Sequence, residues 1–90
     1  MRQFRATIHG KVQGVWFRAW TRDMARELGV TGWVRNMKDG NVEALAHGND
    51  ELLKKFEQRL WEGPPLARVT KIDATWSETD EILPSFSVRR

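Results

Sequence analysis

One stretch of the chain, HGKVQGVWFRAW at positions 9–20, combines two glycines, a lysine and an arginine with no acidic residue. An alternating pattern ends there and a helical one begins, so a glycine-bearing loop leads directly into a helix N-terminus. The free backbone N–H groups and the dipole of such a helix start favour an anion. Lys11 and Arg18 add full positive charges, and a guanidinium can hold two oxygens of a phosphate at once. The stretch therefore predicts a site for a small oxyanion such as phosphate.

The loop is not one of the common nucleotide-binding motifs. Gly14 is followed by Val15 and Trp16, where a Walker A loop has Lys and Ser or Thr, and the glycine spacing is not that of a dinucleotide fingerprint. On composition alone, an ordinary strand-to-helix turn with an exposed arginine remains an equal alternative. The two histidines, His9 and His47, have no nearby set of carboxylates or cysteines, so we expect ordinary strand residues, no metal site and no cofactor.

Length and composition narrow the class of protein. The chain has 90 residues, enough for a single domain over 1–90 with one core. Its 15 Lys and Arg against 12 Asp and Glu give a net charge of +3, which suits an anionic ligand without requiring nucleic acid. There is no cysteine, and no basic leader or apolar run of the ~18 residues that would span a bilayer. We therefore expect a cytoplasmic monomer with no membrane partner.

Hydrophobic periodicity predicts the elements that position the loop. Alternation indicates strands, and apolar residues at three- and four-residue steps indicate helices. The predicted order begins with a strand over 3–9, a helix that starts near Phe17 or Arg18 and stops at Gly29, and a hairpin of strands over 30–36 and 42–48 around Asp39-Gly40. It continues with a helix from about Asn49 through Leu60, a strand over 67–76, a polar loop over 77–85 and a short last strand over 86–90. In the strand over 67–76 the apolar phase changes, which predicts a β-bulge near Thr70 or Lys71.

The order β-α-β-β-α-β is the ferredoxin-like α+β pattern, with two helices on one face of an antiparallel sheet. Right-handed crossovers give four strands in the order 4-1-3-2, to which the C-terminal segment adds a short strand. Strands one and two then run parallel, with strand three between them. The ends of both strands meet at one edge of the sheet, so residues 10–18 and 36–40 should be neighbours.

Two long stretches, GKVQGVWFR and GWVRNMKDGNVEALAHG, strongly resemble the signatures of the acylphosphatase family. The first matches Gly-x-Val-Gln-Gly-Val-x-Phe-Arg at 10–18, and the second matches Gly-Trp-Val-x-Asn with a downstream Gly-x-Val at 32–42. The likeness covers almost all of the chain and departs at no motif position. It implies an enzyme that hydrolyses small acyl phosphates to a carboxylate and inorganic phosphate.

The resemblance also implies the roles of single residues. Arg18 would bind the phosphoryl group, and Asn36 would position the attacking water. The backbone N–H groups of the loop would complete the phosphate site, which then comprises Gln13, Gly14, Val15, Trp16, Phe17 and Arg18. The side chain of Gln13 is expected to hold the loop by hydrogen bonds. The carboxylate leaving group is the anion of an acid of pKa about 4, so it needs no general acid, and the reaction needs no metal.

Two other readings belong to different classes. One is a non-catalytic anion- or RNA-binding ferredoxin-like module, since the five tryptophans invite base stacking. However, GWVRNM and VEALAHG lack the aromatic RNA-binding signature, so no nucleic-acid partner is expected. The other is a detached relative of the acylphosphatase-like domain in larger carbamoyl-transferring maturation proteins. Of the tryptophans, Trp20 is expected in the core or at its rim, and Trp33 and Trp76 are expected in the sheet; Trp16 and Trp61 have no assignment.

Overall fold

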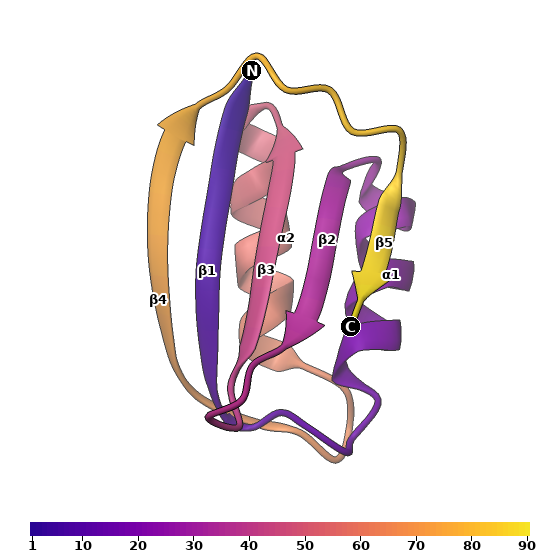
Figure 1. Cartoon of the computed structure of the whole chain (residues 1–90), viewed down its shortest axis with the longest axis vertical. Coiled ribbons are helices and arrows are strands. Elements are labelled where there is room, and N and C mark those ends of the chain that lie inside the picture. Colours follow the sequence, from indigo (N-terminus) through magenta and orange to yellow (C-terminus); the bar gives the residue numbers. More distant parts are fainter.

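The computed structural model describes residues 1–90 and contains five strands and two helices (Figure 1). They follow one another as β1 (Arg2–Lys11), α1 (Phe17–Leu28), β2 (Thr31–Asn36), β3 (Val42–Gly48), α2 (Asp50–Glu62), β4 (Arg68–Glu78) and β5 (Phe86–Arg89). Neither helix is long and apolar enough to cross a lipid bilayer.

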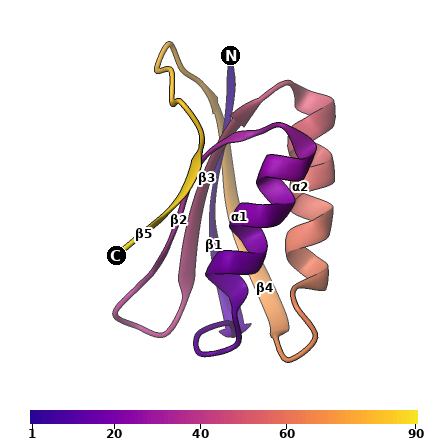
Figure 2. The same cartoon turned by 90° about the vertical axis from the view of Figure 1, so that its right-hand side faces the viewer.

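The strands form one sheet in the order β4-β1-β3-β2-β5. The first four are antiparallel neighbours, and β5 joins the edge parallel to β2. Both helices cover the same face of the sheet (Figure 2). The ferredoxin-like α+β fold and the predicted order 4-1-3-2 are therefore confirmed, with β5 as an added edge strand.

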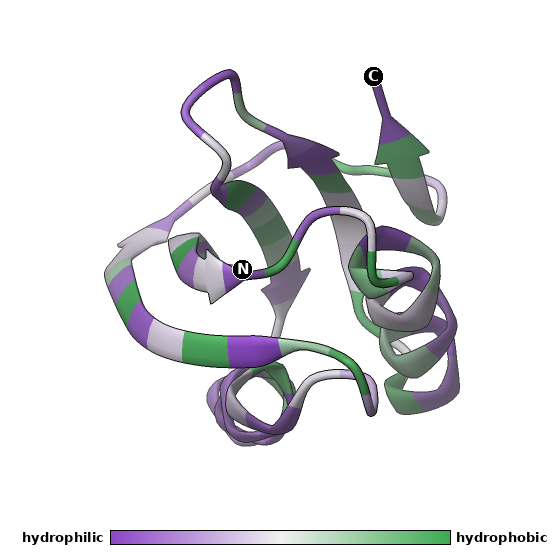
Figure 3. Ribbon diagram, turned by 90° about the horizontal axis from the view of Figure 1, so that it is seen from below, coloured by the Kyte–Doolittle hydropathy of each residue, from purple (hydrophilic) through white to green (hydrophobic).

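The core lies between the helices and that face of the sheet. Hydrophilic and hydrophobic residues alternate along the strands (Figure 3), so each strand turns one row of side chains inward. The largest buried side chains include Phe4 and Ile8 of β1, Phe17 of α1, and Leu53 and Phe56 of α2. Aromatic edges meet there, with the ring centroids of Phe4 and Phe56 5.9 Å apart. This packing holds the start of α1 against the end of β1.

The tryptophans divide as the sequence indicated. Trp33 is buried in the sheet, and Trp76 packs its ring 5.1 Å from that of Phe4. Trp20 lies partly buried at the rim of the core. Trp16 and Trp61, which had no assignment, are exposed.

A bulge in β4 lies where the change of apolar phase predicted it. His9 pairs with Lys71 but Gly10 pairs with Val69, so Thr70 is the extra residue. Gly10 has φ 122°, and a Cβ there would lie 2.0 Å from the carbonyl oxygen of Arg68. The bulge thus brings the backbone of β4 so close that only glycine fits at this position of β1.

The paired strands β1 and β4 are both longer than predicted. Gly10 and Lys11 belong to β1 instead of the loop, and Ser77 and Glu78 belong to β4 instead of the polar segment over 77–85. The reason is pairing: Arg2 lies opposite Glu78 and Lys11 opposite Arg68, so each strand extends its neighbour despite weak local β-propensity.

Candidate active site

The loop between β1 and α1, residues 12–16, is anchored by two buried residues and has two exposed ones. Val12 and Val15 are buried in the core, whereas Gly14 and Trp16 are exposed. Gly14 and Trp16 have positive φ values of 73° and 68°, and Val15 between them does not. Alternation of left-handed and ordinary backbone turns successive N–H groups toward one side, which is the concave arrangement that binds anions.

The donors of this loop are free of backbone partners. No backbone N–H from Gln13 to Ala19 donates a hydrogen bond to a backbone carbonyl. The first turn of α1 has no acidic residue, and Trp16 at its N-cap makes no side-chain cap. The positive end of the helix dipole therefore faces outward beside several free donors, and an anion placed there would be stabilised by both.

Arg18 adds a guanidinium without an ion-pair partner beside these loop donors. It is half-buried in the first turn of α1 and takes part in none of the ion pairs of the molecule. Its charge is thus not neutralised by the protein itself, and its two terminal nitrogens remain available for two oxygens of one anion.

The side chain of Gln13 joins the loop to the β2–β3 hairpin. Its Nε2 donates hydrogen bonds to the carbonyl oxygens of Met37 and Asn41, both at 2.8 Å. The structure thus places residues 10–18 beside residues 36–40, as the topology predicted. The Gln13 side chain therefore has the structural role that was expected, because the hairpin accepts hydrogen bonds from both N–H groups of the amide.

Asn36 is the last residue of β2, immediately before this hairpin. Its Oδ1 is shielded from solvent and accepts no hydrogen bond. A buried unpaired oxygen is unfavourable, and such groups in native structures usually have a function or a bound partner. Rotation about the Cβ–Cγ bond exchanges Oδ1 and Nδ2, so the amide is free to turn either group toward a ligand.

These residues surround one pocket of about 810 Å³. It is lined by Val12, Gly14, Trp16, Phe17, Arg18, Ala19, Arg22, Asn36, Val88 and Arg90. The structure therefore brings Arg18 and Asn36 together with most of the predicted loop. Gln13, Val15 and Lys11 are not among the lining residues; the first two support the loop from behind.

Five lining residues are absent from the predicted site: Val12, Ala19, Arg22, Val88 and Arg90. Arg22 lies four positions after Arg18, and this spacing on a helix would have placed both on one face. Val88 and Arg90 enter through β5, whose place beside β2 depends on pairing between distant segments.

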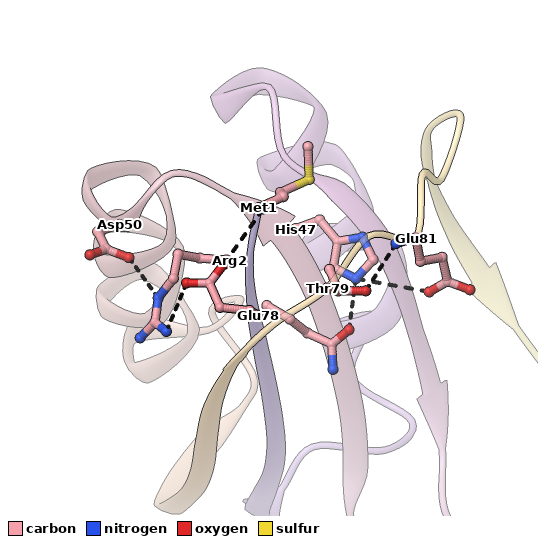
Figure 4. Close-up of polar contacts among 8 residues, drawn as sticks. Met1, Arg2, His47, Asp50, Glu78, Thr79 and Glu81 are labelled. Atoms are coloured by element: carbon pink, nitrogen blue, oxygen red, sulfur yellow. Dashed lines mark hydrogen bonds and ion pairs between the residues drawn. The ribbon is translucent and has the colours of Figure 1, made fainter.

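Neither histidine lies in the pocket. His9 lies 2.9 Å from a carboxylate oxygen of Asp73, and this hydrogen bond holds the pKa of Asp73 below its ordinary value. His47 is buried in β3, with its Nε2 2.9 Å from Oε1 of Gln3 and near Glu81 (Figure 4). Burial lowers the pKa of His47. Both act as ordinary strand residues, as predicted.

The sheet face that the helices leave uncovered does not resemble an RNA-binding platform. Its central aromatic ring, Trp33, is only 8% exposed. The guanidinium carbons of Arg5, Arg35 and Arg89 lie 5.8, 5.6 and 4.8 Å from the ring centroid. Stacking of bases needs an open aromatic face, whereas this one is already occupied by arginines.

A free set of donors at a helix start, an unpaired arginine and an adjacent asparagine define an enzyme-like site for a small oxyanion on a ferredoxin-like sheet. Comparison with known proteins gives the family. Residues 4–88 match the acylphosphatase family model. The chain is 51% identical over 85 residues to an acylphosphatase of Nitrosococcus oceani, covering 94% of both chains. It therefore belongs to the acylphosphatase family.

Solved structures agree with this assignment. The crystal structure of acylphosphatase from Bacillus subtilis matches with a TM-score of 0.97 at 38% identity, over 100% of both chains. HypF from T. kodakarensis matches with a TM-score of 0.87 at 28% identity, but the match covers 99% of this chain and 12% of that protein. The chain is thus an enzyme of acyl phosphate hydrolysis, and the alternative of a non-catalytic binding module is not favoured.

Proposed function

We propose that the enzyme cleaves small acyl phosphates in the pocket between α1 and the β2–β3 hairpin. Arg18 and the backbone N–H groups of residues 13–18 bind the phosphoryl group, and Asn36 positions the attacking water. One observation carries this proposal. Arg18 and Asn36 belong to different elements but line the same pocket, and neither side chain has a hydrogen bond or ion pair that would give it a structural role.

The chemistry requires little beyond placement and positive charge. Water attacks phosphorus in line, the bond from phosphorus to the acyl oxygen breaks, and that oxygen leaves with the electron pair as a carboxylate. The carboxylate is the anion of an acid of pKa about 4, so no group needs to protonate it. The proton lost by the water passes to solvent or to the phosphate product. Arg18 and the loop donors neutralise the charge on the phosphoryl oxygens.

We propose that this reaction uses no cofactor and no metal ion. The positive charge that metal ions supply to many phosphoryl transfers comes here from a guanidinium and a helix N-terminus. Support comes from the side chains themselves, since no group of three or more His, Cys, Asp or Glu residues is placed to hold a metal ion.

The test is hydrolysis of acetyl phosphate in the presence of excess EDTA, compared with glycerol phosphate, an alkyl monoester. We expect full activity on acetyl phosphate with the chelator present. Hydrolysis of the monoester should be undetectable, because an alkoxide is a far poorer leaving group without a general acid. Loss of activity in EDTA that a divalent ion restores, or similar rates on both substrates, would contradict the mechanism.

We further propose that the enzyme works as a cytoplasmic monomer without a nucleic-acid partner. The absence of cysteine suits a reducing compartment and leaves no thiol for a disulfide between two chains. Sedimentation at micromolar concentration should give a single species of 10.5 kDa, and a concentration-dependent dimer would contradict this part.

A further inference from the structure

Trp16 combines a left-handed backbone conformation with an exposed side chain. It is the only non-glycine residue with a positive φ, a region in which Cβ clashes with the backbone. Its side chain is 79% exposed. The indole is neither part of the core cluster nor in any aromatic or cation–π pair. A residue kept in an unfavourable conformation with its large side chain in solvent points to a functional use.

The place of Trp16 indicates which use. It lines the pocket two residues before Arg18, together with the apolar side chains of Ala19 and Val88. The donors that would hold a phosphoryl group belong to the same loop. A substrate bound there by its phosphoryl group therefore has its remaining part within this pocket, where apolar surface is available from both the loop and β5.

We infer that the indole of Trp16 contacts the acyl group of the substrate, so the enzyme favours acyl phosphates with a flat apolar acyl group, such as an aryl group, over acetyl phosphate. This rests on the proposed function, since it takes the phosphoryl site as given. Contact with the substrate would remove exposed indole surface from water, and an aryl group adds ring–ring attraction that a methyl group cannot supply.

The acyl group could instead lie against a cationic side of the pocket, where the positive charge is partly neutralised. This side consists of Arg22 and Arg90, and of these two Arg22 has its Nε paired with Oδ1 of Asp23 at 3.0 Å. The indole of Trp16 has no such competing partner. We therefore favour an apolar acyl group over one that carries a second negative charge.

The experiment compares kcat/KM for benzoyl phosphate with kcat/KM for acetyl phosphate in each variant. Both substrates use the same phosphate site, so a disturbance of the loop backbone affects both and cancels in the ratio. We expect a benzoyl-to-acetyl ratio well above one in the wild type. Trp16→Gly should lower it about threefold to tenfold, in the range of measured aromatic pair energies, and Trp16→Phe should retain most of it. Trp61→Ala removes an exposed tryptophan outside the pocket and should leave the ratio unchanged.

The outcomes distinguish a failure of the proposed function from a failure of the role of Trp16. If the wild type hydrolyses neither substrate, the proposed function fails. If it hydrolyses both but Trp16→Gly keeps the wild-type ratio, the phosphate site stands and the role of Trp16 is wrong. A ratio that stays constant in Trp16→Gly and falls in Arg22→Met would place the acyl group along α1, which also overturns the inference. A thermal melt of each variant confirms that it is folded.

Discussion

Among single residues, those at the two helix starts leave only the α1 N-terminus open to an anion. Asn49 caps α2 by accepting a hydrogen bond from the N–H of Leu52 at 2.8 Å, and Asp50 and Glu51 add negative charge in the first turn. The start of α1 has no side-chain cap and no acid. The α2 N-terminus is thus satisfied within the protein, whereas the donors of α1 remain available to a ligand.

The first prediction separates the roles of Arg18 and Asn36. A ligand that binds only the folded state stabilises it by about 2.7 kcal/mol at a hundredfold excess over its Kd. Phosphate should therefore raise the melting temperature of the wild type. Arg18→Ala should abolish both this rise and turnover, because it removes the paired donors to the anion. Asn36→Ala should keep most of the rise while kcat falls about a hundredfold, the effect of misplacing one reactant.

The readout is the shift caused by phosphate within each variant, measured by thermal denaturation. Asn36 precedes a turn, so its replacement can lower stability by itself, and the internal comparison removes that effect. Normal turnover in Asn36→Ala, or wild-type phosphate stabilisation in Arg18→Ala, would show that the roles are assigned wrongly.

Between elements, the Gln13 side chain is the joint that places the loop before Arg18 relative to Asn36, and we assign catalytic roles to these two residues. It connects the loop before Arg18 to the hairpin after Asn36 through two carbonyl oxygens. Without these hydrogen bonds, the distance between the loop and the hairpin would be set only by the pairing of the strands that carry them. Positioning errors of about 1 Å are enough to slow an enzyme strongly.

We accordingly predict that Gln13→Met lowers the free energy of unfolding by about 1–3 kcal/mol, because two hydrogen bonds are lost, although the carbonyls of Met37 and Asn41 each keep a backbone donor. Its kcat should also fall, while Arg18 continues to bind phosphate. Chemical denaturation and steady-state kinetics measure the two effects. Gln58→Met is the matched control, since Gln58 is exposed on α2 and should tolerate the change. Unaltered kcat in Gln13→Met would argue that the joint has no role in catalysis.

The junction of β1 and β4 gives a second prediction at this scale. Gly10→Ala should destabilise the protein by roughly 3 kcal/mol, because its Cβ would meet the backbone oxygen of Arg68 and φ is positive. Gly40 also has a positive φ, 93°, but a Cβ there meets nothing within 4 Å. Gly40→Ala should therefore lose only about 1–2 kcal/mol from backbone strain. Equal losses in the two variants, measured by urea denaturation, would mean that the bulge does not restrict Gly10.

Over the whole molecule, two buried groups, His47 and Glu43, contribute to the response to acid. Burial lowers the pKa of His47 below its ordinary value of 6.5, although Glu81 opposes this. Burial raises the pKa of Glu43, but hydrogen bonds from Arg35 and Arg5 outweigh it, and the pKa lies below the ordinary 4.5. In both cases the unfolded chain binds protons at higher pH than the folded one, so stability decreases as the pH falls.

The melting temperature should therefore decline in two stages on acidification. The first begins below pH 6.5, the ordinary value for His47, and the second below pH 4.5, the ordinary value for Glu43. His47→Gln should remove the first stage, and Glu43→Gln should flatten the second. Melting curves between neutral pH and pH 3 measure both. A melting temperature that rises below pH 6.5 would contradict the assignment for His47.

The sequence by itself determined the order of the elements, the order of the first four strands and the loop in which we propose an anion site. These follow from local regularities: the periods of apolar residues, the phase change near Thr70, and a glycine loop without acids that enters a helix at Phe17. The long motifs identified the family, and with it the roles expected of Arg18 and Asn36. Local backbone sterics and burial patterns are properties of short segments, so they can be read without coordinates.

Only the tertiary structure decided what surrounds that site. β5 lies beside β2 and brings Val88 and Arg90 to the pocket, although its few residues carry too little pattern to specify a partner strand. The exposure of Trp16 likewise depends on where neighbouring elements end, because a tryptophan next to a helix start packs inward as readily as outward. Which side chains β5 and the end of the loop bring to the pocket depends on the packing of the whole domain, and the period of apolar residues does not specify it.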